Sequence, residues 1–350
     1  KQYRKMYNQN MDNRVLVIGP NYFNYLKASA ESFKKHGYAV TIDAYDTPIH
    51  PYTAVMKLRY KICRNKKLLK AKRISCYNRH IIELFNRIKP DIVFIMNGEI
   101  LTGCTLDYMR RDAKVVVWLY DNLEKLTGSA YHLDHVDLLC SFEQDDVEYL
   151  SKMGDNVRFL PQACDTSTYY PIQKEKDIDI SFVGHIFYSP KRRATIDAVI
   201  ERFPDKKIVV YGLYMPWYKG FWKWLTRKNR KVYKNRMIPA DKVNELYNKS
   251  KVVLNIHQES QKQGANPRTF EIIGSGAYQI CDSNPYIEEL FTDGEIGVYH
   301  NYEELFNLIE EGLNTDKSVN IAKARKYVLE NHSFDRRIEK VLEWIETEIN

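Results

Sequence analysis

The amino-acid sequence predicts an α/β protein built from two doubly wound domains that face each other across a cleft. Short apolar runs alternate with helical periodicity, and this alternation restarts after the polar segment 170–176. Continuous apolar strands joined by helices are typical of a parallel sheet that is covered on both faces. A chain of 350 residues is long enough for two domains, each with its own core.

Each half supplies its own series of strands and helices. In the first half we expect strands at 14–19, 39–45, 91–96, 115–120, 137–142 and 157–160. We expect one helix after the first strand, which includes Phe33 and ends near Gly37, and another at 77–88. In the second half we expect strands at 177–184, 207–211, 252–257, 278–281 and 297–299, with helices at 191–203, 302–312, 319–331 and 334–348. The predicted boundaries are 1–170 for the first domain, 171–333 for the second and 334–350 for a final helix.

A short helix with one carboxylate is predicted between the strands at 252–257 and 278–281. Pro267 can begin it, because a missing N–H costs nothing in the first turn, and Gly274 and Gly276 end it. Its carboxylate, Glu271, has two interpretations. A glutamate near a helix start commonly complements the helix dipole. It could also accept both hydroxyls of a ribose, because ligands of parallel sheets bind beyond the strand ends near helix N-termini.

Further candidates for a ligand site follow the predicted strands. Gly184 ends the first strand of the second half, and the cations after it are typical of a pyrophosphate site at a helix start, although an ordinary turn with a solvated basic face would look the same. In the first half, polar groups follow strands and could orient or deprotonate an acceptor hydroxyl, or simply cap the next helix. The candidates for the donor side are Gly184, His185, Lys191, Arg192, Arg193, Gln263, Asn266, Arg268 and Glu271; those for the acceptor side are Gly19 and Asn97, with Asp121 and Glu99 as catalytic groups.

Several classes of site are absent from the sequence. There is no G-x-G-x-x-G fingerprint, no P-loop and no G-x-S-x-G nucleophile elbow. The nine histidines are dispersed without H-x-x-x-H spacing, so we expect neither a metal site nor a cofactor. The six cysteines form no C-x-x-C pair, which favours reduced thiols in a cytoplasmic protein. No apolar run is long enough to span a membrane, and a chain that starts at Lys1 rather than Met indicates a piece of a longer protein.

Two basic segments account for the net positive charge of the chain. Residues 57–73 hold nine Lys and Arg side chains, and residues 219–236 hold eight more; neither segment has an acid. Without these seventeen, the 53 basic residues fall to 36 against 45 acidic ones, so the rest of the chain is acidic. Segments 57–73 and 217–236 are therefore candidates for peripheral contact with the inner face of the cell membrane. Nucleic acid, a phosphorylated acceptor and plain solvation are the alternatives, with nucleic acid the less favoured partner.

The segment Arg268–Ala277 resembles the R-x-F-E-x-x-x-x-G-A signature of GT-B glycosyltransferases. The most similar group is named for the CgeB spore-maturation protein and is related to the family 4 transferases of glycosyl transferases group 1. Further matching pieces are Ser181-Phe182-Val183-Gly184, Trp118-Leu119-Tyr120-Asp121 and His332-Ser333-Phe334 with Arg337. The resemblance is firm over residues 178–340.

The resemblance implies two Rossmann-like domains, of which the first binds the acceptor and the second binds a nucleotide-sugar, and a final helix that packs back on the first domain. It implies that Glu271 binds the donor ribose and that the basic residues after Gly184 meet the diphosphate. The expected enzyme is a metal-independent and retaining hexosyltransferase of class EC 2.4. Its acceptor would be a cell-surface polysaccharide, a lipid-linked glycan or a protein.

One departure concerns Gln263. Related transferases have a second glutamate eight residues before the one matching Glu271. An amide can hydrogen-bond a sugar hydroxyl but cannot stabilise positive charge as that carboxylate would, so an inverting outcome stays open beside the retaining one. The alternative function is a non-catalytic module that keeps the GT-B shape and recognises sugar or nucleic acid through its basic segments.

Overall fold

The computed structural model describes residues 13–21, 23–46, 66–126, 129–214 and 231–349. Two compact units are present, each with its own sheet. Unit 1 comprises Lys1–Leu160 with Arg337–Asn350, and unit 2 comprises Pro161–Arg336. The chain therefore passes from unit 1 to unit 2 after Leu160 and returns to unit 1 inside its last helix.

Unit 1 contains a six-stranded parallel sheet of order β2-β1-β3-β4-β5-β6. Its strands are β1 (Arg14–Gly19), β2 (Ala39–Ala44), β3 (Ile92–Met96), β4 (Lys114–Leu119), β5 (Leu138–Ser141) and β6 (Val157–Phe159). Its helices are α2 (Tyr25–Lys35), α4 (Lys66–Ile88), α5 (Gly103–Arg110), the 3-10 helix η2 (Ser129–His135), α6 (Gln144–Ser151) and the greater part of α14 (Phe334–Thr347).

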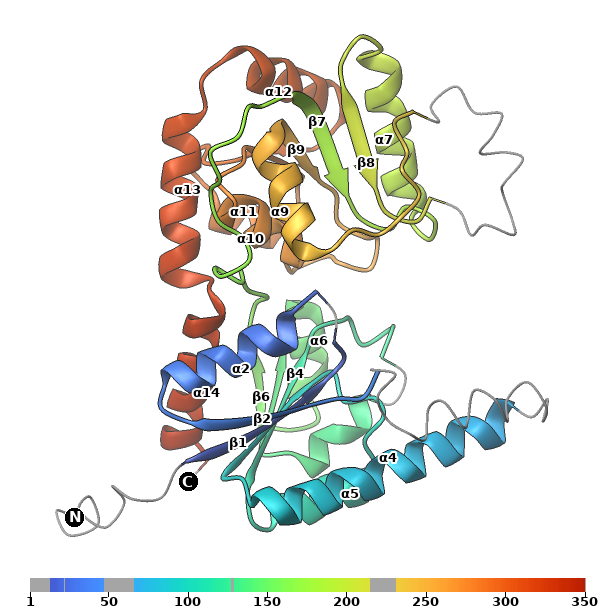
Figure 1. Ribbon diagram of the computed structural model, residues 1–350, viewed down its shortest axis with the longest axis vertical. Helices are drawn as coiled ribbons and strands as arrows, with labels where there is room; N and C mark the ends of the chain where they lie inside the picture. The colour runs from blue at the N-terminus through green and yellow to red at the C-terminus, as the bar shows by residue number, and fades with distance from the viewer. Residues whose placement is uncertain (1–12, 22, 47–65, 127–128, 215–230, 350) are drawn as a thin grey trace, which may run out of the picture. The chain divides into compact units, whose positions relative to one another are not determined.

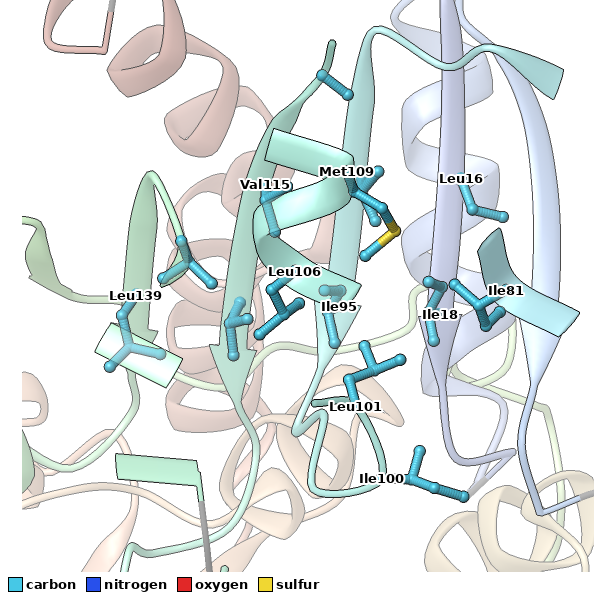
Figure 2. Packing of buried hydrophobic residues seen from close by; sticks show 14 of the residues in the cluster. Leu16, Ile18, Ile81, Ile95, Ile100, Leu101, Leu106, Met109, Val115 and Leu139 are labelled. Atoms are coloured by element: carbon cyan, nitrogen blue, oxygen red, sulfur yellow. The ribbon is translucent and has the colours of Figure 1, made fainter. Parts of the chain in front are cut away.

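Helices cover both faces of this sheet, as a parallel sheet requires. On one face, α4 and α5 pack on alternate residues of the strands, so that Leu16, Ile95 and Val115 meet Ile81 and Met109 (Figure 2). On the other face lies α2, whose Phe33 ring is 5.3 Å from the Phe94 ring (Figure 1). The two residues after α14 contact β4 and β6: Lys114 donates to the carbonyl of Ile349 at 2.6 Å, and Arg158 pairs with Glu348 at 2.5 Å.

Unit 2 contains a five-stranded parallel sheet of order β11-β10-β9-β7-β8. Its strands are β7 (Ile178–Val183), β8 (Ile208–Tyr211), β9 (Ser250–Asn255), β10 (Gln279–Asp282) and β11 (Gly297–Tyr299). Its helices are α7 (Pro190–Arg202), α9 (Ala240–Lys249), α10 (Pro267–Gly274), α11 (Pro285–Leu290), α12 (Tyr302–Asn314) and α13 (Ser318–Asn331). The core on one face joins α7 and α12 to the strands through buried Ile196, Ile309 and Leu254.

The predicted fold class is confirmed: both units are parallel sheets with connecting helices. Each sheet begins with the same strand order, in which the first strand of the unit lies between its second and third. Four α-helices, namely α5, α6, α9 and α11, and the 3-10 helix η2 were not predicted. Strand β9 ends at Asn255 rather than at His257, and β10 extends to Asp282. These shifts move His257 into the loop after β9 and bring Asp282 into the sheet.

Candidate functional site

The strand order of unit 2 reverses between β7 and β9. Chain segments leave these two neighbouring strands in opposite directions. Doubly wound sheets bind ligands beyond the carboxyl ends of their strands at such a reversal. The segment after β7 leads to the start of α7, and the segment after β9 leads to the start of α10. The predicted donor-side residues all lie on these two segments or within the first five residues of the two helices.

Helix α10 is fixed at both ends. The side chain of Asn266 caps it by accepting a hydrogen bond from the N–H of Thr269, and Pro267 occupies the first turn. Gly274 ends the helix where a Cβ atom would lie 2.4 Å from the sulfur of Cys164, and Gly276 follows at φ +73°. Asn266 also donates from its amide to Asn255 at 2.8 Å. The capping interaction thus accounts for Asn266 in the structure, and its contact with a donor stays a prediction.

Glu271 is completely buried, and its carboxylate pairs with the guanidinium of Arg268 one turn earlier in α10. The Arg268 side chain is 13% exposed, so the ion pair lies at the boundary between the interior and the solvent. Beside it, the buried hydroxyls of Tyr169 and Tyr247 make no hydrogen bond within the described residues. Burial, reinforced by the charge of Glu271, raises the pKa of Tyr169. A buried carboxylate that is paired with a cation and has further polar groups close by can accept hydrogen bonds from a polyhydroxylated ligand.

The turn after β7 allows two backbones to approach closely. A Cβ atom on Gly212, at φ +135°, would lie 1.8 Å from the carbonyl oxygen of Gly184, so only glycine fits there. At Gly184 a Cβ atom would meet the ring of Phe182 at 2.9 Å. The next residue, His185, is exposed. Its pKa is lowered by desolvation and by the positive charges of Arg192 and Arg268, and Arg192 also donates to its carbonyl at 3.1 Å.

The three basic residues at the start of α7 have different environments. Arg192 is 7% exposed and donates to the carbonyls of Ile256 at 2.7 Å and His185 at 3.1 Å, so it anchors the turn after β7 to the end of β9. Burial lowers its pKa to about 10. Arg193 lies over the ring of Tyr214 at 5.1 Å, a packing contact that sequence reasoning did not anticipate. Lys191 is 41% exposed at its side chain and is the most accessible of the three.

The N-terminus of α7 already has an anionic partner inside the chain. The carboxylate of Glu259 accepts from the backbone N–H of Lys191 at 3.0 Å and from the hydroxyl of Ser189 at 2.9 Å. Ser189 is the N-cap residue of the helix. From the sequence, the backbone N–H groups of this turn are expected to bind a pyrophosphate. In the structure, Glu259 accepts a hydrogen bond from one of them. Of the predicted elements of the diphosphate subsite, the ammonium of Lys191 is therefore the best placed.

A buried network connects the ends of β9 and β10. The carboxylate of Asp282 accepts from the backbone N–H of His257 at 2.8 Å, lies 2.9 Å from Nδ1 of His257, and pairs with Lys191 at 2.5 Å. Sequence reasoning did not select His257 or Asp282. A signal was present, since both follow apolar runs that become adjacent strands. The distance between the two residues in the sequence does not show that these strands are neighbours, so their contact could not be predicted.

Within the described residues, His257, Cys281 and Asp282 place ligand-type atoms within 4.8 Å of one another. Each of these atoms already faces another protein group: Nδ1 of His257 faces the carboxylate, and the second carboxylate oxygen is paired with Lys191. An ammonium group in that position opposes a divalent cation. Asp177 and Asp179 form a D-x-D sequence at the opposite end of β7, where they pair with Lys207 and Lys251.

The remaining predicted donor residue, Gln263, lies partly buried in the loop between β9 and α10. It interacts with other residues of the chain. Its place in this loop agrees with the predicted side of the sheet, and contact with a sugar stays a prediction.

The acceptor-side candidates cluster at the carboxyl end of the unit 1 sheet. Asn97, at φ +62°, donates to the carboxylate of Asp121 at 3.3 Å and accepts from the N–H of Tyr120 at 2.7 Å. Glu99 instead accepts from the hydroxyl of Tyr45 at 2.8 Å. Gly19 is required by packing, because a Cβ atom there would lie 2.9 Å from both Leu26 and Met96. The structure therefore joins Asn97 to Asp121 and gives Glu99 a different partner.

The two basic segments are described only in part. Residues 57–65 of the first and 217–230 of the second lie outside the described residues. In the first segment, the described residues 66–73 form the start of α4, with exposed Lys67, Lys70, Lys72 and Arg73. A search of the described helices finds none with the length and apolarity needed to cross a membrane.

Comparison with known proteins supports the class that the fold suggests. A family model described as "Glycosyl transferase-like" matches residues 191–343, which include Lys191, Arg268, Glu271 and Asp282. No curated protein matches the chain significantly in sequence. Among solved structures, a sucrose-phosphate synthase from Thermosynechococcus elongatus is similar with a TM-score of 0.69 at 10% identity, over 95% of this chain and 99% of that one.

Two further structures agree with this fold. A glycosyltransferase from Rickettsia africae has a TM-score of 0.65 at 14% identity, over 97% of this chain and 98% of that one. The Anabaena protein HepE, in complex with UDP and glucose, has a TM-score of 0.60 at 11% identity, over 96% and 100%. The chain thus has the GT-B fold of these transferases, and the family match supports a glycosyltransferase-like enzyme.

Proposed function

We propose that this protein transfers a sugar from a nucleoside-diphosphate sugar to a glycan, lipid-linked or protein acceptor. The observation that carries the proposal is the Arg268–Glu271 pair. It lies on α10, beyond the carboxyl end of β9 and next to the strand-order reversal, within the stretch that the glycosyl transferase-like model matches. A carboxylate in this position can accept the two hydroxyls of a ribose, in agreement with the sequence resemblance. UDP is the first donor nucleotide to test, because HepE was solved with UDP and glucose.

In this mechanism the leaving diphosphate is stabilised by fixed cations without a metal. Negative charge develops on the diphosphate as the glycosidic bond breaks, and preorganised donors are most effective at the point where that charge appears. Lys191 is the accessible cation at the start of α7, and Arg268 supports the ribose end. Gln263 offers an amide to the sugar in place of a carboxylate. We propose a retaining outcome on the basis of the sequence resemblance.

On the acceptor side we propose Asp121 rather than Glu99 as the group that orients or deprotonates the acceptor hydroxyl. Asp121 is held by Asn97, which is itself fixed by a hydrogen bond to the backbone, whereas Glu99 is exposed and engaged by Tyr45. A positioned carboxylate is the better general base because its geometry does not have to be established during the reaction. Peripheral membrane contact through the basic start of α4 would suit a lipid-linked acceptor.

Thermal-shift measurements with UDP, GDP, dTDP and ADP test the proposal. We expect one of these nucleotides to raise the melting temperature of the wild-type protein and to have no effect on a folded Glu271→Ala variant. Stabilisation by none of them, together with salt-sensitive binding of RNA or DNA, would contradict a transferase and support the non-catalytic module instead.

A further inference from the structure

We propose that Asp282 is a positioning residue that holds Lys191 in the diphosphate subsite and connects it to the start of α10, where the ribose subsite begins. The inference rests on the proposed function and adds to it a residue that does not itself contact the donor. A buried carboxylate would be expected to repel the diphosphate of the donor, so its presence in this site needs a physical reason.

The charge of the Asp282 carboxylate is balanced by its neighbours. This residue ends β10 and is 4% exposed. Burial alone would raise the pKa of its carboxyl group, but the pKa lies well below its usual range because His257 and Lys191 stabilise the anion. One carboxylate oxygen receives two contacts from His257, and the other receives the ammonium of Lys191. The anion is thus balanced by its own partners and adds little repulsion toward a phosphate.

His257 is 1% exposed, and its two ring nitrogens face different partners. Its Nδ1 atom faces the Asp282 carboxylate, which can only accept, and its Nε2 atom lies 3.3 Å from the backbone N–H of Asn266, which can only donate. The ring is therefore protonated at Nδ1 and unprotonated at Nε2. Because Asn266 is the N-cap residue of α10, this tautomer links Asp282 to the beginning of the helix that carries Glu271.

The same carboxylate holds Lys191. A lysine side chain has a flexible stem, and at 41% exposure it would sample many positions if nothing held it. The contact with Asp282 fixes one of its three N–H donors and leaves two that an incoming diphosphate can use. A single buried carboxylate therefore fixes the ammonium at α7 and, through His257, the N-cap of α10. Residues far apart in the sequence are held together in this way at the ends of neighbouring strands.

The test compares a nucleoside diphosphate with its own nucleoside, using whichever of UDP, GDP, dTDP and ADP gives the largest thermal shift. In Asp282→Asn, calorimetry should show about a tenfold loss of diphosphate affinity, the size of one charge-assisted hydrogen bond, with nucleoside affinity unchanged. Lys191→Met should give the same loss, and the double variant should lose no more than either single one. Asp293→Asn, at an exposed aspartate that pairs with Lys323, is the matched control and should bind both ligands like the wild type.

NMR supplies a readout that does not depend on the nucleotide. Nitrogen-15 spectra should show His257 protonated at Nδ1 in the wild type. The Lys191 ammonium protons should exchange with solvent more slowly in the wild type, where Asp282 holds the group, than in Asp282→Asn. Lys191→Met acts at an accessible side chain, so it tests the contact even if Asp282→Asn fails to fold.

The outcomes separate this inference from the proposed function. Equal loss of diphosphate and nucleoside affinity in Asp282→Asn, or unchanged diphosphate affinity in Lys191→Met, would overturn the positioning role while leaving the transferase proposal in place. A wild-type protein that binds neither ligand would contradict the proposed function, and with it this inference.

Discussion

Replacing Glu271 by glutamine tests the centre of the proposed donor site with the smallest possible change in shape. The variant keeps a side chain of the same size but removes the negative charge that faces Arg268. A carboxylate that accepts both ribose hydroxyls contributes about 1.5–3 kcal/mol through charge-assisted hydrogen bonds. Since about 1.4 kcal/mol corresponds to a tenfold change in affinity, we expect the Kd for the preferred nucleoside diphosphate to rise roughly 10- to 100-fold.

The same substitution should also lower the stability of unit 2. Glu271 is completely buried and Arg268 is 13% exposed, so removing the charge of one partner leaves a poorly solvated guanidinium. Loss of one partner of a fully buried pair costs about 3–5 kcal/mol, and the partial exposure of Arg268 and the remaining amide oxygen reduce this to about 1–3 kcal/mol. For a domain of this size the melting temperature should fall by about 2–10 °C.

The decisive assay is calorimetry with the nucleoside diphosphate and its 2′,3′-dideoxy analogue. The wild-type protein should bind the dideoxy analogue more weakly than the nucleoside diphosphate. The factor should equal the one by which Glu271→Gln weakens binding of the nucleoside diphosphate, and the variant should bind the two ligands equally. Glu310→Gln is the control, because Glu310 forms an exposed pair with Arg202 that contributes little. If Glu271→Gln distinguishes the two ligands as strongly as the wild type does, the assignment of Glu271 to the ribose is wrong.

Three further predictions concern stability, each measured by thermal or urea unfolding. Gly274→Ala should cost about 1–3 kcal/mol because its Cβ would lie 2.4 Å from the sulfur of Cys164, and Cys164→Ala should restore much of the loss; an unaltered stability would contradict the packing. Gly212→Ala should cost about 3 kcal/mol or more, since its Cβ would overlap a backbone carbonyl that cannot move aside as a side chain can; a loss below 1 kcal/mol would refute this. The depressed pKa of Asp282 stabilises the fold above about pH 4, the ordinary pKa of an aspartate, so the stability advantage of the wild type over Asp282→Asn should be constant above pH 5 and decrease as the pH falls below 4. An advantage that grows on acidification would show the opposite linkage.

The sequence was sufficient to predict the fold because strands of a doubly covered parallel sheet are continuous apolar runs. Strand β3, for example, is buried at all five positions. Helix α10 was also predictable, since Pro267 and Gly274 mark its two ends. Two of the helices that were not predicted have weak signals: α6 buries only Leu150 among its eight residues, and α11 has only six residues.

Candidate site residues could be selected from the sequence where a local pattern, such as the end of a strand or the start of a helix, marks them. Lys191 and Glu271 follow the ends of strands and were selected for that reason. Asp282 and Glu259 were not selected, because their roles depend on which strands are neighbours and on which loop folds over a helix start. Arg193 was selected but packs on Tyr214. Three consecutive basic residues look alike in the sequence, whereas the helix turns each of them toward a different surface.

The division of the chain has a consequence for synthesis in the cell. Unit 1 includes Arg337–Asn350, which leave the ribosome only after the whole of Pro161–Arg336 has been made. At about 5–20 residues per second, that interval lasts roughly 10–35 seconds. During this time the first unit lacks α14, including buried Ile338 and Val341, and those apolar side chains have yet to be made. The nascent chain therefore exposes the apolar surface that α14 covers until that helix has been made, and a variant that lacks Arg337–Asn350 would expose it permanently.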